Sequence, residues 1–553
     1  MRALLVLFLI SSIACGEAFD LKTVIHPVVQ KLVKPKIAPE FVANALAIST
    51  SSQKASDHVL AGLTQLNAPW DFEAYRHFAA AAEEDPDCLM AYWGISMSLA
   101  GLNHEFYGER KAAVERMLDL LEAGSGVEWE KGFAQAAGHL YTNGVGTSAE
   151  IYGKIAEKYP NNIQAKLFSL FLPRDGYSET GRPGVKQKKC IEGLEKLVKS
   201  NPENVMVISA WVMVHAEAPL NPLTMRTDVL PFARKLARLH PSYPPFQLIA
   251  SHVEARCGNA ELGIGYAREA IKYYKAYQEL DEVSIYDCPG LVKAQVYLAS
   301  LLAGKDKYEE AHQIADALAK QKVEEERLFS RGGSMLLWEA RSLGPRIALA
   351  KGQVADLDHG LELLKVFNDE EWFEKQSFSV SYRNALAFCI GVRKALLKKD
   401  YAIADGLYRD LIKRVQVIDA EAALARKTSS YAEWLRGRNT IEVFAVELRG
   451  MLAMRETGAM KRAALTWFKS ASDRQSRSPN LLPPAILYPL ENRVGEYYLS
   501  VDDSENGAKA YREGLERMPN HLGSLRGYRS ALLKLGKNDT AKKIAERIEL
   551  VKK

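Results

Sequence analysis

The sequence has no large excess of one charge, little cysteine and no strand-like pattern, and these absences exclude several classes of protein. Its 73 basic and 68 acidic side chains leave a net charge of +5, too weak a field to favour nucleic acid as a partner. With 37 glycines and 22 prolines among 553 residues, collagen-like and low-complexity chains are excluded as well. No run alternates apolar and polar residues over the length of a strand. What is left is a folded helical protein.

Cysteine is sparse, with six in the chain and no CxxC or CxxCH spacing. This pattern excludes zinc ribbons and c-type haem attachment. The cysteines are also too scattered for a disulfide framework. One bridge that involves Cys257 or Cys288 stays open for an oxidising compartment, although buried free thiols are favoured.

The chain starts with a targeting signal, MRALLVLFLISSIA, in which one arginine precedes about a dozen apolar or small residues. This run is shorter than the roughly 20 residues that span a bilayer. Two processing routes stay open: cleavage after Ala18, or acylation of Cys15, because Ser12-Ile-Ala-Cys15 resembles a bacterial lipobox. Both routes predict an exported protein, either periplasmic or lipid-anchored in the cell envelope. Membrane contact is expected only in the second route, through the lipid on Cys15.

Small and aromatic residues recur at fixed positions in windows of 34 residues. Gly62 and Phe78 fall at positions 8 and 24 of one window, and Gly495 and Tyr511 fall at the same positions of another. This frame resembles the tetratricopeptide repeat (TPR), whose small residues let two antiparallel helices approach closely. The matching windows begin at Ala55, Pro244, Val292, Tyr488 and Leu522.

The resemblance implies an all-α fold, an α-solenoid of stacked antiparallel helix pairs. Residues 85–94 and 482–489 are further similar to exported, uncharacterised bacterial TPR-containing proteins. The predicted divisions are a signal peptide (1–18), an N-terminal lead-in (19–54), an N-terminal TPR-like array (55–329), irregular helical repeats (330–437), and C-terminal TPR-like repeats with a capping helix (438–553).

Catalytic signatures are missing, since the sequence has no phosphate-binding GxxxxGK[ST], no GxSxG and no HExxH. His252 and Glu254 are two residues apart, so on a helix they point to different sides and do not share one ion. We therefore predict a non-enzyme with no cofactor and no metal, although a metal site assembled between repeats stays open.

The resemblance also implies where a partner binds, because repeat positions 2, 5, 9 and 12 line the groove of a TPR superhelix. The candidate groove residues are Val59, Leu63, Leu248, His252, Val296, Ser300, Arg526 and Ser530. No window has the lysine at position 5 and asparagine at position 9 that clamp a peptide carboxylate. The mixed, mostly apolar set suits an amphipathic helix or an extended peptide.

The predicted function is therefore non-catalytic binding of a protein or peptide partner at the cell envelope. Two alternatives remain: an enzyme with a site in the irregular middle, and an envelope carbohydrate-binding protein. Convergent histidine, glutamate and aspartate in one pocket would favour the enzyme. Exposed tyrosines and tryptophans along one concave face would favour carbohydrate binding.

Overall fold

The computed structural model describes residues 19–41, 46–101, 104–178, 182–216, 224–328, 330–365, 377–425, 431–475 and 482–552. The predicted signal peptide and the lipidation candidate Cys15 lie outside these ranges. Within them, β pairing is limited to one isolated bridge between Tyr177 and Pro183, and the rest of the regular structure is helical. None of the helices described is long and apolar enough to cross a bilayer. The all-α prediction is confirmed.

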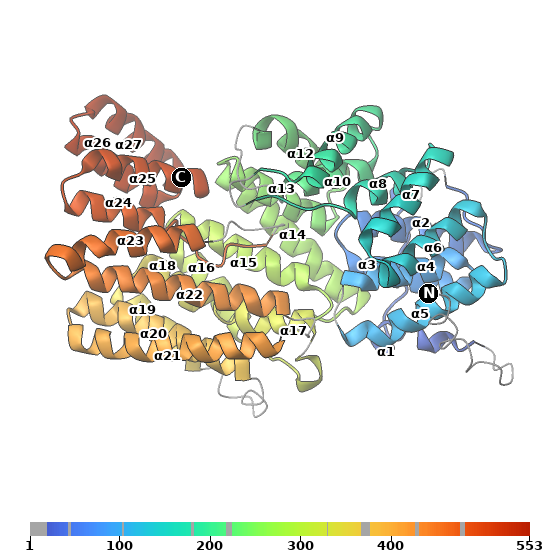
Figure 1. Cartoon of the computed structure of the whole chain (residues 1–553), viewed down its shortest axis with the longest axis horizontal. Helices are drawn as coiled ribbons and strands as arrows, with labels where there is room; N and C mark the ends of the chain where they lie inside the picture. Colours follow the sequence, from blue (N-terminus) through green and yellow to red (C-terminus); the bar gives the residue numbers. More distant parts are fainter. Residues whose placement is uncertain are drawn as a thin grey trace.

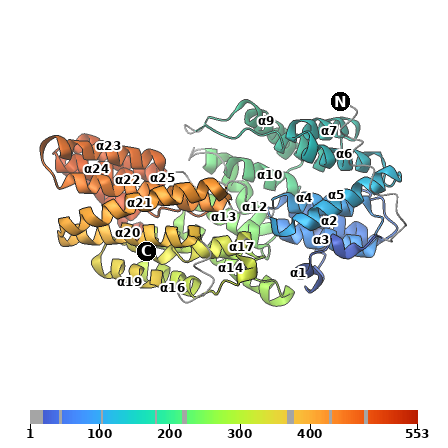
Figure 2. The same cartoon turned by 60° about the horizontal axis from the view of Figure 1, so that its bottom comes forward.

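Helices that follow one another in sequence pack side by side in pairs and stack along the molecule (Figures 1 and 2). Both views show the N-terminal helices at one end, α19–α25 at the other, and α13 and α14 between them. The helices are α1 (Pro27–Gln30), α2 (Gln53–Asn67), α3 (Asp71–Glu84), α4 (Leu89–Ser98), α5 (Tyr107–Glu122), α6 (Glu128–Thr142), α7 (Val145–Lys158), α8 (Ile163–Phe171), α9 (Val185–Ser200), α10 (Val205–Ala216), α12 (Leu230–Leu239), α13 (Pro244–Arg256), α14 (Ala260–Asp281), α15 (Pro289–Gly304), α16 (Tyr308–Ala319), α17 (Arg331–Met335), α18 (Leu343–Lys351), α19 (Val354–Lys365), α20 (Ser377–Lys398), α21 (Tyr401–Ala425), α22 (Tyr431–Met454), α23 (Gly458–Arg474), α24 (Glu491–Ser500), α25 (Ser504–Arg517), α26 (Leu522–Lys534) and α27 (Asn538–Lys552).

Glycine at repeat position 8 lies against the aromatic ring at position 24 of the same pair. A Cβ atom added to Gly62 would lie 2.8 Å from the ring of Phe78, and one added to Gly495 would lie 2.7 Å from that of Tyr511. Both distances are too short for a side chain, so glycine is what lets the two helices approach. The repeat frame that the sequence predicted is therefore the packing frame of these pairs.

The core is continuous across the predicted divisions. One cluster of buried apolar residues runs from Ile264 to Leu490 and so crosses residues 330 and 438. The middle segment does contain an irregular element, a π-helical turn over Leu336–Ala340. As domain divisions, these boundaries stay predictions.

The described cysteines, Cys257 and Cys288 among them, are free and buried. The described cysteines are therefore buried free thiols, the alternative that the sequence favoured over a disulfide bridge.

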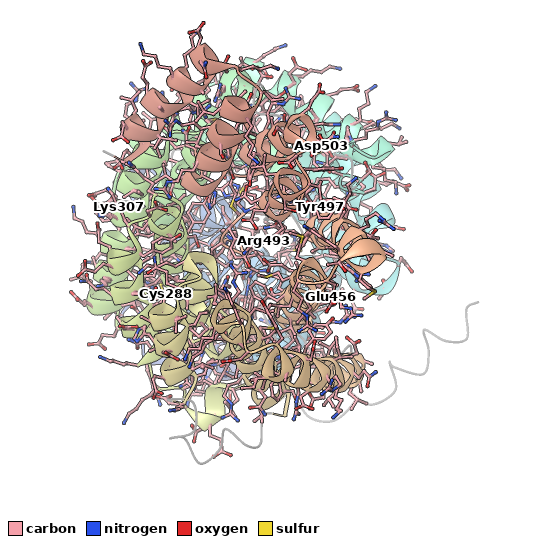
Figure 3. All side chains as sticks on the ribbon, turned by 90° about the vertical axis from the view of Figure 1, so that its left-hand side faces the viewer. Cys288, Lys307, Glu456, Arg493, Tyr497 and Asp503 are labelled. Carbon is pink, nitrogen blue, oxygen red and sulfur yellow. The ribbon has the colours of Figure 1, made fainter. Side chains whose placement is uncertain are left out.

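Several buried charges in the interior are paired. The Glu447 carboxylate accepts hydrogen bonds of 2.7 Å from Arg493 Nε and from the Tyr488 hydroxyl. Figure 3 shows Arg493 near the middle of the end view, whereas Lys307 lies at its margin. At the N-terminal end, Arg76 reaches from α3 to Asp281 of α14 at 3.2 Å, which ties the first helix pair to the middle of the stack.

Candidate functional site

Three of the predicted groove residues are completely buried in the core. Val59, Leu63 and Val296 are each 0% exposed. The first two lie on α2, which is covered by α3, α4 and α10. These residues present no surface to a partner, so they do not enter the candidate site.

His252 and Ser300 line one cavity of about 190 Å³. The other candidates lie elsewhere: Leu248 lines a second cavity, while Arg526 and Ser530 are exposed on α26. Arg526 forms an ion pair with Asp306. The structure thus brings two of the eight candidates together.

The walls of this first cavity, which we call the central cavity, come from distant parts of the chain. They include α13, α15 and α22, the segment before α24, and the turn between α25 and α26. Its apolar lining consists of Ala255, Ala260, Tyr297, Leu301, Val443, Pro483, Pro484, Ala485, Ile486, Leu487, Met518 and Pro519.

The charged lining of the central cavity is all of one sign. Its five lysines and arginines are Arg256, Lys305, Arg436, Arg474 and Arg517, and its lining residues include no aspartate or glutamate. Four of these cations form ion pairs with acidic residues that are not part of the lining: Arg517 with Glu491, Arg474 with Glu442, Arg436 with Glu339 and Lys305 with Glu261. Arg474 is nonetheless 49% exposed. The arrangement favours an anionic ligand that also carries apolar groups.

His252 is a buried polar side chain in this wall. Its side chain is 2% exposed, and no described residue forms a hydrogen bond with either ring nitrogen. Burial, with help from Arg256, lowers the pKa of His252 to about 3. The ring is therefore neutral at physiological pH, with one donor and one acceptor nitrogen.

A proline-containing segment forms another wall, and arginines hold it in place. Proline has no N–H, and the segment belongs to no helix, so its carbonyl groups need donors from outside. Arg436 donates to the carbonyl oxygen of Pro483 at 2.9 Å, and the fully buried Arg346 donates to that of Ala485 at 3.0 Å. Glu339, also 0% exposed, lies 3.1 Å from Arg436. This charged group fixes the wall.

The second cavity, of about 250 Å³, contains Leu248 and charges of both signs. Burial raises the pKa of Glu105 to about 7, although Arg327 Nε lies 2.7 Å from its carboxylate. Burial also raises the pKa of Asp71. With lysine, arginine and several acids in one lining, this cavity selects no ligand charge.

The tyrosines that could have formed a sugar-binding face are mostly internal. Tyr274, Tyr277 and Tyr497 are between 4% and 8% exposed. The Tyr277 hydroxyl donates to Glu73 at 2.7 Å, so its polar end is used within the fold. These residues do not present the exposed aromatic surface that carbohydrate binding requires.

Sequence reasoning missed most of the central cavity. The prolines of residues 482–489 are visible in the sequence, but they contributed only to the similarity to bacterial TPR-containing proteins. Nothing in the sequence pairs Arg346 and Arg436 with carbonyl groups that lie 139 and 47 residues further along the chain.

No family model matches the chain, and no curated protein matches it. Among solved structures it is similar to a chain of the APC/C hetero-tetramer Cut9–Hcn1, with TM-score 0.29, 13% identity, and coverage of 89% of this chain and 79% of that one. It is also similar to the P58(IPK) TPR domain, with TM-score 0.20, 11% identity and coverage of 88% and 99%. A third similar structure is that of the human IFIT1 dimer with PPP-AAAA, with TM-score 0.30, 11% identity, and coverage of 85% of this chain and 95% of that one. TM-scores this low establish no common global arrangement, so the TPR-like fold rests on the helix pairs and glycine contacts described above.

Proposed function

We propose that this chain is a non-catalytic scaffold that binds an acidic, partly apolar segment of a protein partner in the central cavity. The observation that carries the proposal is the lining, with five cations and no carboxylate. The unpartnered ring of His252 adds a hydrogen-bonding group beside them. Glutamate or aspartate side chains of the partner would pair with the cations of the lining, and leucine-like side chains would cover Val443 and Ile486.

The composition of the cavity favours a peptide over a nucleic acid. Single-stranded nucleic acids are held by aromatic side chains on which bases stack. Among the lining residues the large aromatic ring is Tyr297, which is 5% exposed and lies 5.6 Å from the ring of His252. The apolar lining is instead mostly aliphatic, which suits peptide side chains.

Fluorescence anisotropy with a labelled peptide of alternating glutamate and leucine tests the proposal. We expect this peptide to bind, its lysine–leucine counterpart not to bind, and affinity to fall as salt is raised. Arg474→Gln should weaken binding about tenfold, because it removes a charge-assisted hydrogen bond. Arg238→Gln, at an exposed arginine of α12, is the matched control and should bind as the natural chain does.

Two outcomes would overturn the proposal. One is equal binding of the acidic and basic peptides, which would show that charge does not select the ligand. The other is displacement of the acidic peptide by a single-stranded RNA oligonucleotide at lower concentration than by unlabelled peptide, which would assign the cavity to nucleic acid.

We further propose that the protein acts in the cell envelope, on the strength of the signal in residues 1–18. The mass of the chain purified from its own cells tests this location. A chain that begins at Phe19, or at a lipid-modified Cys15, supports export. A chain that retains Met1 argues against it.

A further inference from the structure

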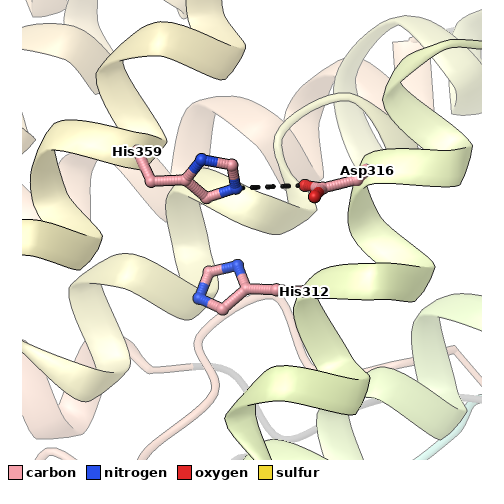
Figure 4. A group of neighbouring side chains, drawn as sticks. All are labelled: His312, Asp316 and His359. Carbon is pink, nitrogen blue, oxygen red and sulfur yellow. Dashed lines mark hydrogen bonds and ion pairs between the residues drawn. The ribbon is translucent and has the colours of Figure 1, made fainter.

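Two histidines and two aspartates meet between two neighbouring helix pairs, away from the central cavity. His312 and Asp316 are four residues apart on α16, and Asp356 and His359 are three apart on α19. Each spacing places both side chains on one face of its helix. His312, Asp316 and His359 each offer a ligand atom, and these atoms lie within 4.8 Å of one another (Figure 4).

The side chains are already directed toward one another. His359 Nε2 lies 3.1 Å from Asp316 Oδ1, and the two imidazole rings are 5.3 Å apart between centroids. On the other side, His312 Nε2 lies 3.8 Å from Asp356 Oδ1. Figure 4 shows one ring nitrogen of His312 turned toward His359 and Asp316 and the other turned away. The nitrogen that faces the group is therefore Nδ1.

His312 supplies a second and independent observation. Both of its ring nitrogens are buried, and neither makes a hydrogen bond to any described residue. Buried polar atoms are normally satisfied, so an unsatisfied imidazole beside a carboxylate and a second imidazole marks a place for a missing partner.

We propose that His312, Asp316 and His359 bind a divalent transition-metal ion of the zinc class, which links α16 to α19. Two imidazoles and one carboxylate form a ligand set that zinc accepts in tetrahedral geometry with one further position. Bonds of about 2.0–2.1 Å place tetrahedral ligand atoms about 3.4 Å apart. The His359–Asp316 pair already has nearly this spacing, and small rotations bring in His312.

The surroundings fit the proposal. Asp356 lies behind His312, where a carboxylate can accept the hydrogen bond of a metal-bound imidazole and fix its orientation. Lys351 Nζ lies 2.8 Å from Asp356 and offsets its charge, so the site is not a bare acidic patch. The side chain of His359 is 42% exposed, which leaves an entry path for the ion. Because α16 and α19 belong to successive helix pairs, the ion would hold two repeats together.

Titration of the untagged, chelator-treated full chain with Zn²⁺ alone tests the site, with Co²⁺ as a spectroscopic probe. We expect one Zn²⁺ per chain, a rise in melting temperature on binding, and visible Co²⁺ absorption of the tetrahedral type. His312→Ala, His359→Asn and Asp316→Asn should each weaken binding by at least about tenfold, since even outer-shell changes cost 10–100-fold. The matched control is His139→Ala on α6, a half-buried histidine whose ring bonds to Asn143.

The result that overturns the proposal is the absence of Zn²⁺ binding to the natural chain, or binding that all three variants retain. His359→Asn alters the most exposed of the three ligands, so it keeps the test decisive if His312→Ala fails to fold by circular dichroism. Loss of binding in His139→Ala to the same degree would place the ion elsewhere and would also overturn it.

Discussion

The side-chain amide of Asn520 donates a hydrogen bond of 2.5 Å to the carbonyl oxygen of Gly258, across 262 residues of sequence. The bond joins the turn between α25 and α26 to the turn between α13 and α14. Arg547 Nε in turn donates to Asn520 Oδ1 at 2.7 Å, which fixes the orientation of the amide. Asn520 also lines the central cavity, and the contact attaches the C-terminal helices to the middle of the stack.

Asn520→Gly should loosen this attachment. Asn520 has a φ of 65°, a conformation that glycine adopts without strain, so the variant removes the side chain and leaves the turn intact. We expect the free energy of unfolding to fall by about 1 kcal/mol and amide exchange in α24–α27 to become faster. Asp502→Gly is the control: its φ is 58° and its side chain is 94% exposed. Unchanged exchange in Asn520→Gly would show that the contact does not hold the C-terminal helices.

Arg436→Met should destabilise the protein strongly. Two nitrogens of Arg436 lie 3.1 Å from the two carboxylate oxygens of Glu339, whose side chain is 0% exposed. Removal of the arginine leaves a buried charge without its partner, at a cost of about 3–5 kcal/mol. The double variant Glu339→Gln/Arg436→Met should recover much of this loss. Urea denaturation of the four proteins of this cycle measures the coupling, and additive losses would contradict the expectation.

His252 should make the protein less stable in acid. Its pKa is lowered by burial to about 3, whereas the unfolded chain binds this proton near pH 6.5. Stability is therefore complete above pH 6.5 and declines as pH falls toward 3, by about 2 kcal/mol at pH 5.

His252→Leu should therefore be more stable than the natural chain at pH 5, with a smaller gain at pH 8. The measurement is chemical denaturation at both pH values. His139→Leu, at a half-buried position, serves as the control and should show no such difference. An equal gain of His252→Leu at both pH values would assign the effect to packing and not to the proton.

The cysteines should be unreactive in the folded protein. Burial raises the pKa of Cys88 and of Cys288 to about 12, so almost no thiolate is present at pH 8. A thiol reagent such as Ellman's reagent should label these residues only after denaturant is added. Rapid labelling of the native chain would show that the helix pairs open on the timescale of the assay.

The fold could be predicted from the sequence because its signal is local. A glycine such as Gly62 and a ring such as Phe78 are 16 positions apart within one 34-residue window. Similar spacings of small and large residues recur in the other windows. The candidate groove was harder to predict because α4 and α10 also pack on α2, which turns Val59 and Leu63 from surface into core.

The sites depend on contacts that no single window contains. Asp316 and His359 are 43 residues apart, so a search for ligands on one helix predicted no metal site. The central cavity likewise joins His252 to His521. The repeat frame predicts how neighbouring helices pack, but it does not predict which helices far apart in the sequence come into contact.

Two kinds of glycine in the helices differ in the space around them. A Cβ on Gly495 would lie 2.7 Å from the ring of Tyr511, which is also confined by Gly527 on its other side, whereas a Cβ on Gly265 in α14 would meet nothing within 4 Å. Gly495→Ala should therefore lower the free energy of unfolding by about 1–3 kcal/mol through overpacking. Gly265→Ala should raise it by about 0.5–1 kcal/mol, because alanine loses less backbone freedom in a helix.

Removal of the Tyr511 ring tests whether its contact with position 495 causes the loss of stability. In a Tyr511→Leu background the contact is gone, so Gly495→Ala should cost much less there than in the natural chain. Thermal or urea unfolding of the five proteins provides the comparison. If Gly495→Ala loses as much stability without the ring, position 8 requires glycine for its backbone conformation. The contact between glycine and the aromatic residue would then not set the distance between paired helices.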